Sequence, residues 1–128
     1  MTKVLQILLA VLLTLSLGAM VGFWVHPQML AQGLGVGEID GLAPLGRATL
    51  RADFGGFFGA GGLFTLYALA RRRADLLAVP AVLLGLALFG RLVGFVADGG
   101  GRAEIGPIVV ELVGALLCYT AMRTLPRA

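Results

Sequence analysis

The sequence is poor in the residue types that build catalytic and metal sites. It contains one cysteine, one histidine, one serine and no asparagine. A single cysteine excludes an intrachain disulfide, and the two soft metal ligands, His26 and Cys118, lie far apart along the chain. The glycine-rich stretches do not follow a predicted strand, so they do not predict a nucleotide-binding loop. We therefore expect no metal, no cofactor and no enzymatic activity.

Charge is scarce as well. Only 13% of the 128 residues are charged and 59% are hydrophobic, with a mean hydropathy of +0.95. This composition predicts a single integral membrane domain over residues 1–128 rather than a soluble protein. The net charge is +3, but the basic residues cluster at the ends of apolar segments, where they anchor helices. We expect no nucleic-acid partner.

Long hydrophobic runs are what the chain has in abundance. Four apolar segments fill it, at residues 4–25, 50–70, 76–97 and 105–122. The first is uncharged and, at about 1.5 Å per residue, long enough to cross a hydrocarbon core of about 30 Å. Open sheet edges are not tolerated in lipid, and the segments lack the alternation of barrel strands. The prediction is an all-α, integral membrane four-helix bundle.

Three basic regions fall on one side of this predicted membrane, whereas the loops on the other side carry Glu38, Asp40, Asp98 and Glu104 against Arg47 and Arg102. The three basic regions contain Lys3, the three arginines at 71–73, and Arg123 with Arg127. Because cytoplasmic loops carry an excess of basic residues, we expect both termini in the cytoplasm. Phe23 and Trp24 then mark the outer interface, and Tyr67 and Tyr119 the inner one.

The longest connection, residues 26–49, is rich in glycine but too apolar to extend freely into water. It predicts either a short helix or re-entrant segment over the outer ends of the bundle, or an ordered surface loop.

Charged residues in the outer halves of the predicted helices form the candidate site: Arg51, Asp53, Arg91, Asp98 and Glu111. Arg91 lies about 9 Å inside the outer end of its helix, and Glu111 lies about equally deep. A charge at a helix centre costs about 2.5–3.5 kcal/mol on insertion scales, so pairing inside the bundle is favoured. We expect Arg91 to reach Glu111 or Asp98, with Arg51 or Asp53 close enough to join.

Three interpretations of this charged cluster remain open. It forms a structural ion-pair network that fixes helix order, or it lines a polar pocket for a headgroup, ion or other ligand. In the third interpretation the charges simply extend to the interface.

Glycines recur at the spacing that lets membrane helices approach closely. The pairs are Gly18 and Gly22, Gly55 and Gly59, and Gly90 and Gly94. They predict helix packing, either within one bundle or between copies.

Three local patterns together resemble a known family. They are the stretch LRADFGG at residues 50–56, Gly90-Arg91, and Asp98-Gly99. In this order they resemble an uncharacterised family of small bacterial four-helix membrane proteins, known as domain of unknown function 4345. The resemblance covers most of the chain after Ala48. It implies a four-helix fold in a bacterial inner membrane, and it implies no reaction. The residues that match the recurring positions are Arg51, Gly55, Gly56, Arg91, Asp98 and Gly99.

The sequence favours a non-enzymatic accessory or scaffold subunit of a membrane complex, or a binder of a lipid-like ligand. Its expected partners are membrane lipids and either another membrane protein or further copies of itself. The alternative is a small oligomeric transporter or channel with Glu111 as the coupling carboxylate. An enzyme using Asp98 and Glu111 as acid and base is less favoured, because no nucleophile accompanies them.

Overall fold

The computed structural model describes residues 2–35 and 44–125, which are helical apart from short turns. No strand occurs in these two ranges. Three helices are long and apolar enough to cross a membrane: Thr2–Val25, Ala74–Ala97 and Arg102–Thr124. The fold is therefore all-α, and these helices indicate a multi-pass membrane protein.

The described helices follow the four apolar segments of the sequence within a few residues. They are α1 (Thr2–Val25), η1 (Leu50–Phe54) continuing into α4 (Gly55–Arg71), η2 (Ala74–Leu77) continuing into α5 (Ala78–Ala97), and α6 (Arg102–Thr124). The helix α4 alone has 17 residues. At about 1.5 Å per residue, α4 is shorter than a hydrocarbon core of about 30 Å. It extends further only through η1, a π-helical turn.

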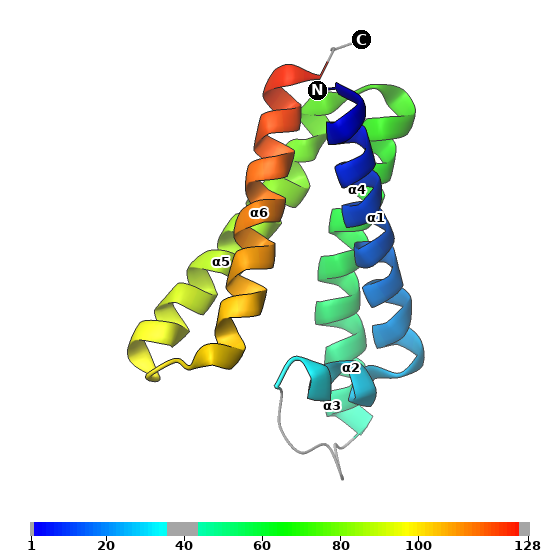
Figure 1. The fold of residues 1–128 in the computed structure, drawn as a ribbon. Coiled ribbons are helices and arrows are strands. Elements are labelled where there is room, and N and C mark those ends of the chain that lie inside the picture. The colour runs from blue at the N-terminus through cyan, green and yellow to red at the C-terminus, as the bar shows by residue number, and fades with distance from the viewer. Residues whose placement is uncertain (1, 36–43, 126–128) are drawn as a thin grey trace.

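The long helices pack as two antiparallel pairs. The helix α1 packs along α4, and α5 packs along α6 (Figure 1). The two pairs approach each other near the start of α1 and the end of α6, at the top of Figure 1, and diverge towards the other end. We call these the closed end and the open end.

The buried side chains explain this shape. One core cluster lies at the closed end and draws on α1, α4, η2 and α6: Leu9, Ala68, Leu77, Cys118 and Ala121. A second cluster at the open end, Phe23, Ala31 and Leu50, joins α1 to α2 and η1. Among the described residues, neither cluster ties α5 or α6 to the first pair at the open end. The pairs are free to separate there.

Glycines allow the close contact between α1 and α4. A β-carbon at Gly55 would lie 2.5 Å from the indole nitrogen of Trp24, and one at Gly62 would lie 2.6 Å from Leu17 Cδ2. At Gly59 it would meet the sulfur of Met20 at 2.9 Å. These separations are shorter than van der Waals contact, so the glycines set the distance between the two helices.

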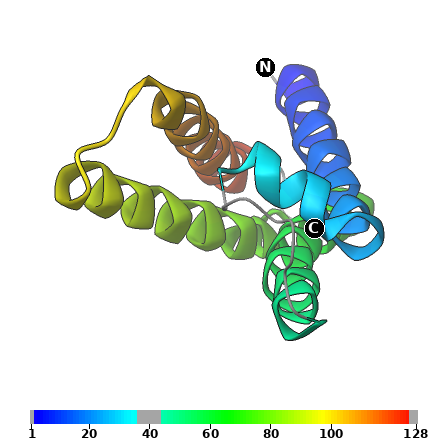
Figure 2. The same ribbon diagram turned by 90° about the horizontal axis from the view of Figure 1, so that it is seen from below.

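Two short helices follow α1 at the open end, α2 (Pro27–Gly33) and α3 (Pro44–Thr49). The structure therefore contains short helices where the sequence predicted either a short helix or an ordered loop. Pro27 and Ala31 of α2 are buried, and Figure 2 shows α2 reaching from the end of α1 towards α6. Residues 36–43 of this connection, like Arg127, lie outside the described residues.

The turn between α4 and η2 lies at the closed end and is basic. Arg72 adopts a left-handed conformation with φ of 52°, and the amide of Arg73 donates to the Ala68 carbonyl. Arg73 forms a two-fold hydrogen-bonded ion pair with Asp75. These hydrogen bonds and the negative charge of Asp75 raise the pKa of Arg73.

Outward-facing side chains are predominantly apolar. Ile7 is 63% exposed, Leu86 65% and Val96 84%. Large exposed apolar patches of this kind are rare on monomeric soluble proteins, whereas lipid solvates them. Beside the closed-end turns, the guanidinium groups of Arg71 and Arg123 lie over the rings of Tyr67 and Tyr119. Such aromatic and basic pairs are typical of a membrane interface.

Candidate functional site

Arg91 of α5 and Glu111 of α6 form an ion pair across the second helix pair. Arg91 Nε donates a hydrogen bond to Glu111 Oε1 at 2.6 Å. The Glu111 side chain is only 12% exposed, against 33% for Arg91. The carboxylate is buried on the same inner face of α6 as Gly114 and Cys118. The Glu111 carboxylate therefore contacts only Arg91, the two adjoining cavities and the helices packed around it.

Both partners of this ion pair retain unused hydrogen-bonding capacity. Glu111 Oε2 is buried and has no hydrogen-bond partner in the described part of the chain. Leaving a buried acceptor unsatisfied costs about 1–3 kcal/mol, and more when it is charged. A guanidinium has five N–H donors. Within residues 2–35 and 44–125, Arg91 forms a hydrogen bond only through Nε. Its terminal nitrogens can bind a further group.

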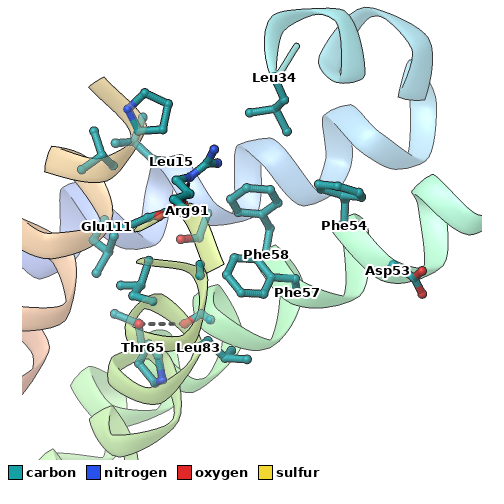
Figure 3. Close-up of a pocket in the computed structure, with 18 of the residues that line it drawn as sticks. Leu15, Leu34, Asp53, Phe54, Phe57, Phe58, Thr65, Leu83, Arg91 and Glu111 are labelled. Carbon is teal, nitrogen blue, oxygen red and sulfur yellow. Dashed lines mark hydrogen bonds and ion pairs between the residues drawn. The ribbon is translucent and has the colours of Figure 1, made fainter. Parts of the chain in front are cut away.

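An apolar cavity of about 690 Å³ lies between the two helix pairs, with the ion pair in its wall. Its other lining side chains are mostly aliphatic and aromatic, among them Leu12, Leu15, Phe54, Phe57, Phe58 and Leu83. Figure 3 shows Arg91 and Glu111 on one side of this space and the phenylalanines of η1 and α4 on the other. The cavity exists because the pairs diverge towards the open end.

A second, polar cavity of about 760 Å³ continues towards the open end. Asp98 and Glu104 line it together with Gln32 of α2. Its wall shares several residues with that of the apolar cavity, namely Leu34, Ala87, Arg91, Pro107 and Glu111. The ion pair therefore stands at the boundary between an apolar compartment and a polar one.

Pro107 adds a polar backbone atom to this boundary. It lies inside α6 and has no N–H, so the Ala103 carbonyl one turn earlier lacks its usual helical donor. Ala103 and Pro107 both line the polar cavity. The Ala103 carbonyl oxygen can therefore accept a hydrogen bond from another group at this boundary.

Arg51 and Asp53 of the candidate site do not join the ion pair. Arg51 Nε donates instead to the Trp24 carbonyl at 3.0 Å. That carbonyl belongs to the last turn of α1, which lacks helical donors, so Arg51 caps α1. Asp53 lines the edge of the apolar cavity, and in Figure 3 it lies beyond Phe54 and Phe57, apart from Arg91 and Glu111.

Asp98 shares the polar cavity with Arg91 but forms no ion pair with it. Its side chain lies beside Gly94, where a β-carbon would be 3.7 Å from Asp98 Oδ2. Asp98 follows α5 directly, and the left-handed Gly99 then turns the chain towards α6. Its carboxylate therefore remains available at the open end.

The predicted glycine pairs differ in their surroundings. Gly55 and Gly59 lie in the α1–α4 contact. A β-carbon at Gly90 would meet nothing within 4 Å, and one at Gly94 would meet only the Asp98 side chain. Both also line the polar cavity, so within this chain they leave space beside α5 rather than packing against another helix.

Several lining residues were not among the sequence-predicted site residues. Phe54 and Phe58 stack with Phe23 at ring separations of 5.2 and 5.8 Å, and this stack supports the cavity wall opposite Arg91. The concentration of phenylalanine at residues 54–64 is the only sequence signal for them. Leu34, which projects into the cavity from the turn after α2 (Figure 3), gave no signal.

No group of three or more metal-ligating side chains occurs among the residues the structure describes. His26 is exposed beyond the end of α1, whereas Cys118 is buried in the closed-end core. Comparison with family models, curated proteins and solved structures finds no match to this chain. The function must be inferred from the site itself.

Proposed function

We propose that this chain is a non-enzymatic accessory or scaffold subunit of the bacterial inner membrane that holds a lipid-like ligand beside Arg91 and Glu111. The main supporting observation is the apolar cavity of about 690 Å³ with a buried ion pair in its wall. Ligand sites are commonly about 300–1,000 Å³, mostly apolar, with a few polar groups that orient the ligand. The cavity has these properties.

The proposal includes a four-helix bundle with both termini in the cytoplasm. In that orientation the closed end, with Arg71 and Arg123, faces the cytoplasm, in accordance with the positive-inside rule. The open end, with the polar cavity, then lies in the outer half of the membrane. The resemblance to domain of unknown function 4345 is part of the same proposal, since its recurring arginine and aspartate correspond to Arg91 and Asp98.

A non-enzymatic role is supported by the groups that line the apolar cavity. Thr65 is buried there, but its hydroxyl donates to the Gly61 carbonyl at 2.7 Å. Ser16 is the single serine of the chain and also lines this cavity, but no histidine accompanies it there. The lining therefore offers no activated nucleophile.

Co-purification in a mild detergent tests the proposal. Native mass spectrometry should find the chain with bound lipid or with a stoichiometric protein partner. Glu111→Gln should reduce the retained lipid, whereas Asp75→Asn, at the closed end, should not. A bare monomer without lipid or partner would contradict the proposal.

A transporter or channel is the second candidate. It is favoured by one observation: Glu111 lies on a cavity between two helix pairs that separate at one end. A coupling carboxylate must exchange a proton or ion with such a space. Flux into liposomes that Glu111→Gln abolishes and Asp75→Asn preserves would support this function over the first.

A further inference from the structure

We propose that the two cavities together bind an aminophospholipid, with its phosphate on Arg91, its primary ammonium among the acidic side chains of the polar cavity, and an acyl chain in the apolar cavity. The inference rests on the proposed function, because it names the chemistry of the lipid-like ligand. The ligand class is that of phosphatidylethanolamine.

The phosphate position follows from the free donors of Arg91. Its Nε is engaged with Glu111 Oε1 at 2.6 Å, whereas no acceptor for its terminal nitrogens lies in the described ranges. A guanidinium binds phosphate oxygens through two parallel N–H groups. Arg91 also lines both cavities. A phosphate held there would stand at the boundary between the apolar and polar compartments, as the phosphate of a phospholipid must.

The ammonium position follows from the balance of charge and of acceptors. Besides Arg91, the charged residues that line the polar cavity are three carboxylates: Asp98, Glu104 and Glu111. Glu111 is engaged with Arg91, so Asp98 and Glu104 leave an excess of negative charge. Glu111 Oε2 adds a buried acceptor that has no donor in the described part of the chain. A cationic group that donates several hydrogen bonds fits these surroundings.

This combination distinguishes between lipid headgroups. In a purely anionic headgroup, the group beyond the phosphate carries no positive charge. It would lie beside Asp98 and Glu104 and would leave their negative charge uncompensated. A choline headgroup carries positive charge but no N–H, so it satisfies none of the unpaired acceptors. A primary ammonium supplies both the charge and three donors. The polar cavity therefore selects the aminophospholipid.

The apolar cavity accounts for the acyl chain. It begins at the ion pair and is lined on the opposite side by Phe54, Phe57 and Phe58 (Figure 3). Ala87 lies at the junction with the polar cavity, where its small side chain leaves room for the ligand to pass.

A lipid titration of the delipidated, full-length protein in detergent tests the inference. The readouts are the thermal unfolding temperature and the number of lipids retained in native mass spectrometry. The probes share their acyl chains and differ in headgroup: phosphatidylethanolamine, its N,N-dimethyl derivative, phosphatidylcholine and phosphatidylglycerol. We expect phosphatidylethanolamine to bind about tenfold more tightly than phosphatidylcholine or phosphatidylglycerol, because hydrogen bonds to charged groups are worth about that factor. The dimethyl derivative should fall between.

The acidic side chains are tested by Asp98→Asn combined with Glu104→Gln. This variant should lower the preference for phosphatidylethanolamine over phosphatidylcholine to about one while still binding lipid, whereas Asp75→Asn keeps the preference. Equal binding of all headgroups by the wild-type chain would overturn the aminophospholipid inference and leave the proposed lipid site standing. Preferential binding of phosphatidylglycerol would also overturn it. The absence of retained lipid with every probe would overturn both, and the wild-type series decides even if the double variant fails to fold.

Discussion

Arg91 and Glu111 lie opposite each other on adjacent helices, with 2.6 Å between Nε and Oε1. Neither residue has another ion-pair partner in the described part of the chain. Glu111 is the more deeply buried of the two. Removing the partner charge should therefore cost more free energy of unfolding when Glu111 is left behind than when Arg91 is left behind. The consequences of this asymmetry can be measured.

Arg91→Leu should destabilise the protein by about 3–5 kcal/mol, because it leaves the Glu111 carboxylate buried without a counter-charge. Combining it with Glu111→Leu should restore part of that loss, since two apolar side chains can replace a buried pair at little cost. Equilibrium unfolding in detergent measures both variants. Arg102→Leu, an exposed arginine at the start of α6, is the control and should have little effect. A double variant that is no more stable than Arg91→Leu alone would contradict the pairing as a stabilising contact.

Ala87→Phe should displace the ligand from the junction of the two cavities. The larger side chain fills space that Ala87 leaves open, so we expect the lipid retained per protein to fall at least several-fold. Leu86→Phe, on an exposed position of the same helix, is the matched control and should retain lipid normally. Quantitative lipid extraction after purification gives the comparison. Equal retention in the two variants would place the ligand elsewhere.

Gly62→Ala should destabilise the α1–α4 pair by about 1–3 kcal/mol, the usual effect of overpacking a tight contact. The new methyl group would meet Leu17 at 2.6 Å. The neighbouring Gly61→Ala meets nothing within 4 Å and should be neutral or stabilise the helix by up to about 1 kcal/mol. Thermal unfolding of the two variants side by side gives the difference. Identical behaviour would mean that the glycine face does not set the helix separation.

Cysteine labelling tests the proposed orientation. In a Cys118→Ala background, Arg73→Cys should react with a membrane-impermeant reagent only from the cytoplasmic side, and Arg102→Cys only from the opposite side. Both parent residues are exposed in turns or at a helix end, so access is not limited by burial. The reverse pattern would invert the topology, and with it the leaflet in which the polar cavity lies.

The helices and the Arg91–Glu111 contact could be predicted from the sequence because both depend on position along the chain. Hydropathy locates the helices, and the rise per residue places the two charges at one depth. The remaining candidate residues could not be placed in this way. Depth gives no information on helix rotation, and rotation directs Arg51 to the Trp24 carbonyl and Asp53 away from Arg91.

The cavities could not be predicted for a related reason. They depend on the angle between the helix pairs, which is set by contacts between distant residues such as Leu9 with Leu77 and Cys118. The same glycine spacing can mark a close helix contact or an open space beside a helix, and the sequence does not distinguish the two. Gly55 meets Trp24 across a helix contact, whereas Gly90 has open space beside it.

The short turn between α5 and α6 has a consequence for biosynthesis. Arg91 leaves the ribosome before Glu111, and an arginine that enters the bilayer alone costs about 2.5–3.5 kcal/mol at a helix centre. The turn is brief, from Asp98 to Gly101, so the counter-charge follows within one helix length. We therefore expect α5 and α6 to leave the translocon together as a hairpin whose charges have already met, rather than one helix after the other.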